Sequence, residues 1–279
     1  MPHKTMLSPV LVLAGIMLLV TGASVAGAQT DYYNTDAGRP ITVEDAYPTE
    51  RYAFEFQLAP VRLERARGGL YSWEFEPEIA YGILPRTHLE LGLPIAYQDA
   101  RGGARRSGIA GLELSALHNL NVETSWPALA VAAEVLFPVG PLAYDDTYGT
   151  VKGIMTRTFT WARFHVNGAY TFGSEPEIGA ASGAVDASRW LGGVAIDKTF
   201  PLRALLITAE TVARQPIFES EDVEWSIGTG ARYQISPQLS LDGGIGKVVT
   251  GDEQPWFITF GLARAFGIRS LFPSLGGRR

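Results

Sequence analysis

Cysteine is absent from the 279 residues, which excludes a fold held together by disulfide bonds. The 31 glycines follow no collagen-like repeat, and a chain that is 46% hydrophobic is too apolar to be disordered. Basic residues are fewer than acidic ones, 23 against 29, so we expect no nucleic-acid partner. After residue 28 no stretch approaches the roughly 18 to 20 apolar residues of a membrane helix, so any membrane span must be made otherwise.

The first 28 residues read as an export signal. Lys4 supplies a positive start, Leu7 to Val20 is an apolar run, and Ala26-Gly27-Ala28 has the small residues that a signal peptidase needs. We expect cleavage after Ala28, which leaves 22 basic and 29 acidic residues and a net charge of about −7. An uncleaved anchor is the alternative, because Leu7 to Ala28 would almost span a bilayer, although Thr21 and Gly22 dilute its second half.

The stretch LYSWEFEPEIAYGIL, residues 70–84, alternates strictly. Its odd positions are apolar and often aromatic, whereas Glu74, Glu76 and Glu78 occupy even positions. In an extended strand successive side chains point to opposite faces, so one face is apolar and the other carries three carboxylates.

The same alternation recurs along the chain and predicts twelve strands. Their expected ranges are 52–58, 70–84, 87–97, 109–120, 128–138, 150–159, 161–172, 189–198, 204–214, 223–235, 239–249 and 256–266. Short connections alternate with long polar ones such as residues 99–108, 139–149 and 173–188. An even strand count with short turns at one end and long loops at the other is typical of a bacterial outer-membrane barrel.

Aromatic residues gather at the two ends of the predicted strands. Two girdles of amphipathic rings are expected where a barrel crosses the two water interfaces, and a soluble barrel has no reason for them. A soluble β-sandwich alternates equally well, so loop asymmetry and girdles, not alternation, favour the membrane barrel. The predicted girdle residues are Tyr71, Trp73, Tyr97, Trp190, Trp225 and Trp256 at the outer ends, and Tyr52, Tyr81, Tyr233 and Phe266 at the inner ends.

The polar face of each strand would then line a wet lumen. The turn at 84–86 places Glu74 opposite Ala96 and Glu78 opposite Gly92, and the turn at 236–238 can place Arg232 beside Asp242. Rings of acids favour cations or polar solutes in a narrow pore; a plugged barrel with a structural charge network is the equal alternative. The predicted pore-lining residues are Glu55, Glu74, Glu76, Glu78, Glu90, Glu113, Glu134, Arg163, His165, Glu210, Arg214, Glu224, Arg232 and Asp242.

Residues 51–266 would form this barrel, with a segment at each side. Residues 29–50 are polar and lack a clear period, so they are either a periplasmic lead-in or a plug folded into the lumen. Residues 267–279 would trail into the periplasm after Phe266, unless the last strand reaches Phe272.

We predict no catalytic residues, no metal and no cofactor. A lipid-modifying enzyme would need a serine beside a histidine on the outer lipid-facing side, and His88, His165 and His118 are placed elsewhere. Residues 144–149, YDDTYG, either hold calcium or form a solvated loop. Arg101, Arg105 and Arg106 either touch lipopolysaccharide phosphates or are merely solvated.

The stretch TDAGRPITVEDAYPTERYAFEFQL, the glutamate-rich strand after it and YGILPRTHLELGLPIAY resemble a family of outer-membrane barrels known as meta-pathway phenol-degradation proteins, often labelled transporters. The resemblance is sharpest over residues 35–97. It implies an outer-membrane barrel that passes small, aromatic or hydrophobic compounds. Many such barrels end on an aromatic residue, whereas here Phe266 is followed by 13 more residues.

The sequence therefore predicts an all-β fold, a transmembrane up-and-down antiparallel barrel of about twelve strands in the outer membrane. We expect a non-enzymatic pore or transporter whose partners are outer-membrane lipid, lipopolysaccharide and a small-molecule solute. The alternatives are a closed structural or surface-interaction barrel and a lipid-modifying enzyme.

Overall fold

The fold is described from a computed structural model that places residues 34–65, 71–99, 105–176, 187–218, 221–251 and 254–268. The predicted signal peptide, residues 29–33, Arg101 and residues 269–279 lie outside these ranges. Every named element in them is a β-strand, and none of the placed residues forms a helix long and apolar enough to cross a membrane.

Fourteen strand segments make up the fold. They are β1 (Ala53–Arg65), β2 (Tyr71–Leu84), β3 (Thr87–Gly92), β4 (Ile95–Asp99), β5 (Arg106–Ile109), β6 (Leu112–Asn121), β7 (Ala128–Phe137), β8 (Tyr148–Thr158), β9 (Arg163–Phe172), β10 (Ser188–Thr199), β11 (Leu205–Pro216), β12 (Glu224–Ser236), β13 (Leu239–Val248) and β14 (Trp256–Gly267).

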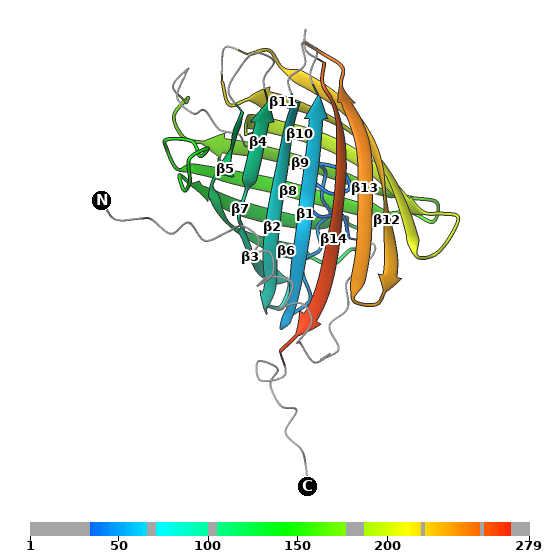
Figure 1. Cartoon of the computed structure of the whole chain (residues 1–279). Helices are drawn as coiled ribbons and strands as arrows, with labels where there is room; N and C mark the ends of the chain where they lie inside the picture. The colour runs from blue at the N-terminus through cyan, green and yellow to red at the C-terminus, as the bar shows by residue number, and fades with distance from the viewer. Residues whose placement is uncertain are drawn as a thin grey trace.

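These segments form one closed antiparallel barrel of twelve strands, as predicted (Figure 1). β1 closes it by pairing with β2 on one side and β14 on the other. β3 and β4 are one strand interrupted at Leu93-Pro94, and β5 and β6 are its neighbour, interrupted at Ala110-Gly111. Proline has no N–H for a strand ladder, and the Ala110 N–H bonds to the Pro94 carbonyl at this break.

Two boundaries differ from the predicted ones by more than two residues. The first strand continues to Arg65 because a bulge between Leu58 and Val61 shifts the alternation by one position, which hides the continuation from a period-two pattern. The strand predicted to start at 109 begins at Arg106, inside a stretch predicted as loop, because β5 pairs with β4 through Ile95 and Ile109.

The two faces of the barrel differ as the alternation predicts. Large apolar side chains such as Val151, Ile227 and Ile245 are more than half exposed on the outer face. Buried polar side chains such as Asn167 and Arg232 face inward. The predicted registers are confirmed, because Glu74 pairs with Ala96, Glu78 with Gly92 and Arg232 with Asp242.

Candidate functional site: the barrel interior

Residues 34–49, here called the interior segment, run through the inside of the barrel. Ile41, Val43 and Ala46 within it are at most 3% exposed. Its side chains and backbone bond to inward-facing residues of β3, β6, β8, β9, β11, β12, β13 and β14, which together span most of the circumference. The interior segment therefore occupies the lumen.

A buried cluster of charges holds the first part of the interior segment. Arg39, with no exposed side-chain surface, lies 2.9 Å from Asp242, 2.5 Å from Asp36 and 3.6 Å from Glu55. Arg232 of β12 reaches Asp36 at 2.7 Å and Asp242 at 3.4 Å. The predicted ion pair of Arg232 and Asp242 is confirmed, but Arg39, which lies between two wall acids, could not be found from strand alternation.

The middle of the interior segment is held by its backbone. The carboxylate of Glu210 accepts hydrogen bonds of 2.9–3.0 Å from the N–H groups of Thr42 and Val43. The Thr259 hydroxyl donates to the Pro40 carbonyl at 2.7 Å. Wall residue Gly244 lies so close that a Cβ atom there would meet the Pro40 oxygen at 2.2 Å. The wall is thus shaped to the backbone of the interior segment.

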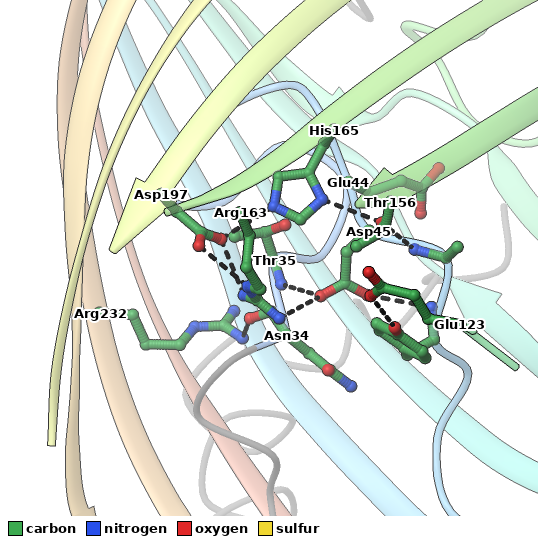
Figure 2. A network of polar contacts seen from close by, with 12 residues as sticks. Asn34, Thr35, Glu44, Asp45, Glu123, Thr156, Arg163, His165, Asp197 and Arg232 are labelled. Carbon is green, nitrogen blue, oxygen red and sulfur yellow. Dashed lines mark hydrogen bonds and ion pairs between the residues drawn. The ribbon is translucent and has the colours of Figure 1, made fainter. Parts of the chain in front are cut away.

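A series of hydrogen-bonded side chains holds the last part of the interior segment, around Ala46 (Figure 2). The Ala46 N–H donates to the Thr156 hydroxyl, which lies 3.0 Å from His165 Nδ1, and His165 Nε2 lies 2.9 Å from Asp197. Because a backbone N–H can only donate, the Thr156 O–H is free to donate to Nδ1, and Nε2 then carries the proton that faces Asp197. Arg163 clamps the same Asp197 carboxylate through two nitrogens.

Two further side chains bind this last part from other strands. Asn167 accepts from the Glu44 N–H and donates to the Glu44 carbonyl, at 2.8 and 2.9 Å. Lys152 pairs with the Glu44 carboxylate at 2.5 Å, and Asn119 donates to the Ala46 carbonyl. The buried apolar residues of the interior segment belong to two small clusters, one around Val43 and one around Ala46.

Two acids of the interior segment have displaced pKa values. Burial alone would raise the pKa of Asp36, but the guanidinium groups of Arg232 and Arg39 outweigh it and lower this pKa to about 2. Burial raises the pKa of Asp45 to about 8, against the opposing effects of Arg163 and of the Tyr47 N–H. Asp36 is therefore charged, and Asp45 protonated, when the segment is docked at neutral pH.

Raising the pH from 6 to 9 should weaken docking of the interior segment. Undocked, Asp45 has an ordinary pKa near 3.8, so between pH 4 and 8 the docked state holds a proton that the undocked state releases. Docking is therefore strongest below this window and is lost progressively as pH rises through it. Limited proteolysis of the folded protein should cut the segment faster at pH 9, and Asp45→Asn should remove this pH dependence. An unchanged pH profile in that variant would contradict the assignment.

A partly open cavity remains between the interior segment and the long-loop end. It has a volume of about 270 Å³, and Asp36 and Glu44 form part of its floor. Seven of the predicted pore-lining residues line it: Glu74, Glu76, Glu78, Glu90, Glu113, Glu134 and Arg214. Six of these seven are acids on the neighbouring strands β2, β3, β6 and β7, so one wall of the cavity is acidic.

The basic side chains around this cavity are paired. Lys152 reaches Glu44, Arg62 reaches Glu64 at 3.2 Å, and the Arg214 guanidinium reaches Glu224 at 2.6 Å. Acidic side chains therefore outnumber basic ones around the cavity. Of the other seven predicted lining residues, Glu224 pairs with Arg214, and six contact the interior segment or its anchors, namely Glu55, Arg163, His165, Glu210, Arg232 and Asp242.

The loop at residues 138–147, here called the mouth loop, folds inward at the long-loop end. Leu142 is buried against Ala96 and Ala110, at the interruption of the two short strand pairs. Tyr144 packs with Tyr148 and with Ile217 of another loop. Asp145 and Asp146, in the stretch 144–149 for which calcium is one of two interpretations, are exposed. Among the placed residues no three His, Asp or Glu side chains are arranged to hold a metal ion.

The three histidines of the barrel have different surroundings. His88 accepts from the Thr49 N–H, His118 lies 2.8 Å from the Thr87 hydroxyl, and His165 belongs to the buried chain described above. Among the placed residues none of them contacts a serine. The Asp197, His165 and Thr156 arrangement resembles a hydrolase triad in order, but its hydroxyl is fully buried and is engaged by the Ala46 N–H.

The predicted girdle residues lie at the strand ends, five of them exposed and five half-buried. Tyr71, Trp190, Trp225, Tyr233 and Trp256 are 36–48% exposed. Trp73 stacks on Tyr97, and Phe54 stacks on both Tyr81 and Phe266. Tyr52 precedes β1 in a left-handed backbone conformation, under the Arg51 guanidinium.

Sequence alternation missed aromatic residues in the short turns. Trp126 is 74% exposed and Trp161 55%, and Trp161 packs with Phe159 and Phe164. Both tryptophans lie outside the strands and thus have no strand parity. Their position in the short turns at the inner end could have identified them as further aromatic residues of the inner girdle.

No family model matches the sequence, and no curated protein does. Among solved structures, the fold is similar to that of an outer-membrane channel from Pseudomonas putida F1, with 13% identity, a TM-score of 0.55, and 83% of this chain and 100% of that one covered. It is also similar to the NanC porin, with 7% identity, a TM-score of 0.52, and 75% and 98% covered. At these identities the likeness shows the fold, an outer-membrane type of barrel.

Proposed function

We propose that the protein is an outer-membrane channel through which small solutes pass passively, with the interior segment as its plug. The observation that carries this proposal is the acid-walled cavity of about 270 Å³ enclosed by a barrel whose outer face is apolar. An apolar outer face around a polar interior suits a strand barrel in hydrocarbon, where every backbone group is paired by closure. The two similar solved structures are themselves a channel and a porin, which supports the proposal.

Passage requires the interior segment to move. It blocks the barrel below the cavity, and the mouth loop narrows the opening above it. Because the segment is held mostly by hydrogen bonds and ion pairs, water and solute ions can replace its contacts at modest cost when it leaves. The protein thus rests as a closed channel. Export by the signal at residues 1–28, and lipopolysaccharide contact through Arg105 and Arg106, belong to the same proposal.

Conductance of the purified protein in a planar bilayer tests the function. We expect small, infrequent openings of the whole chain and larger, steadier ones when residues 34–49 are deleted. If neither form conducts, and liposomes containing either form take up neither sugars nor small aromatic acids, the closed structural barrel is the correct alternative. A closed structural barrel would also have a plugged lumen, so the two hypotheses differ only in whether the deletion variant conducts.

The acidic wall should make the channel favour cations. In the open channel, where water fills the lumen and hydrates these carboxylates, replacing Glu76 and Glu113 together by glutamine should lower the sodium-to-chloride permeability ratio about three- to fivefold, because hydrated carboxylates in a confined space concentrate counter-ions. Reversal potentials across a salt gradient measure the ratio. Asp222→Asn, an exposed change outside the lumen, is the matched control and should leave the ratio unchanged. Equal ratios in all three proteins would show that solutes take another path.

A further inference from the structure

A groove on the outer face of the barrel lies at its short-turn end. It has a volume of about 420 Å³ and is lined mainly by Trp161, Ile196, Lys198, Phe200, Ile207 and Ala209. Trp161 comes from the turn between β8 and β9 and Phe200 from the turn after β10, so two turns flank the groove at one end. Its volume falls in the range of small-molecule sites in proteins.

The floor of the groove is low because small residues meet there. Ile196 pairs across strands with Ala209, and Ala209 pairs with Thr229 on β12. Because the Thr229 hydroxyl is bonded to the Thr208 carbonyl, it offers the groove mainly its methyl group. Larger apolar residues, among them Ile196 and Ile207, also line the groove. The part of the groove farther from the turns therefore suits a hydrocarbon chain.

The end of the groove near the turns is chemically different. Lys198 pairs in register with Ile207 and is exposed, and its ammonium group forms no ion pair with any placed residue. Trp161, 55% exposed, presents its indole ring at the same end. An ammonium group and an indole N–H at the membrane interface suit a phosphate group above an acyl chain.

The acid closest to this end does not oppose an anion. Asp197 is 2% exposed, and its carboxylate is held inside the barrel by Arg163 and His165. Its charge is therefore compensated on the other side of the wall. Arg203, in the same turn as Phe200, is also exposed and carries a positive charge.

We propose that this groove binds one anionic phospholipid of the inner leaflet, with the phosphate at Lys198 and Trp161 and one acyl chain along Ile196, Ile207 and Ala209. The inference requires the barrel to lie in a membrane, but it does not require the lumen to conduct.

Native mass spectrometry of the delipidated full-length protein tests the site. We expect one dioleoyl phosphatidylglycerol to be retained in preference to dioleoyl phosphatidylcholine. Lys198→Gln should weaken phosphatidylglycerol binding about fivefold, the effect of one interfacial charge, and should leave phosphatidylcholine binding unchanged. Lys247→Gln, on the outer face of β13 at the opposite end of the barrel, is the matched control and should have no effect.

A second variant tests the acyl-chain part. Ala209→Phe fills the groove and should weaken binding of both lipids, while heat-modifiable migration on a detergent gel confirms that the barrel has formed. Equal binding of the two lipids by the unaltered protein, or equal behaviour of Lys198→Gln and Lys247→Gln, would overturn the proposal. Ala209→Phe should conduct like the unaltered protein, so failure of the channel and failure of the lipid site are distinguishable.

Discussion

Replacing Arg39 by alanine should raise the bilayer conductance of the protein at least about tenfold. The Arg39 guanidinium is fully buried and lies between Asp36, Asp242 and Glu55, so its loss leaves the guanidinium of Arg232 to compensate these acids alone. Removing one partner of a buried ion pair costs about 3 kcal/mol or more, which shifts the docking equilibrium of the interior segment by over about 100-fold. Single-channel recording measures the change as open probability.

The control for this variant is Arg51→Ala. Arg51 lies just after the interior segment, is exposed, and contacts the ring of Tyr52 instead of a wall acid. It should conduct like the unaltered protein. If Arg39→Ala also remains closed while its barrel stays heat-modifiable, the buried cluster does not hold the plug.

Replacing Gly244 by alanine should displace the interior segment by a different route. The new Cβ would lie 2.2 Å from the Pro40 carbonyl oxygen and 2.8 Å from the Thr259 hydroxyl, distances that the packed backbone cannot tolerate. Overpacking of this kind costs about 1 to 3 kcal/mol, so proteolysis within the segment should accelerate by about tenfold or more. Gel analysis after a brief protease treatment measures the rate.

Gly168→Ala is the matched control, because it makes the same chemical change on the outer face of the same barrel. No atom lies within 4 Å of a Cβ added at Gly168. This variant should be cut at the unaltered rate and should retain its melting behaviour. Equal cleavage of the two variants would mean that Gly244 does not hold the segment in place.

The barrel itself could be predicted from the sequence because its physical cause is periodic. Strands that separate an apolar outside from a polar inside repeat the same alternation, and the sharp turn at 84–86 fixed the register of Glu74 and Glu78. The pairing of Arg232 with Asp242 followed from the same counting across the next-to-last turn. The bulge near Leu58 hid half of a strand because it breaks that period.

The path of the interior segment could not be predicted in this way. Its conformation has no repeat, and its contacts reach residues up to 219 positions away, as Pro40 and Thr259 show. Alternation placed His165 and Glu210 on the inner face. It could not reveal that Glu210 binds the backbone of Val43, or that His165 bonds to Thr156, which in turn accepts from the Ala46 N–H. An open pore and a plugged one can be told apart only when the hydrogen-bond partner of each inward-facing polar side chain is known.

The partners of Arg39 come from opposite ends of the chain. Asp36 lies before the barrel and Glu55 in its first strand, whereas Asp242 belongs to the penultimate strand. Closure of the barrel also requires β1 to pair with β14, where Phe54 stacks on Phe266. The binding site of the Arg39 side chain is thus complete only when nearly all strands of the barrel have assembled. Docking of the interior segment and pairing of β1 with β14 are then late and coupled steps of folding. In a chain truncated before residue 242, the interior segment would therefore have no binding site.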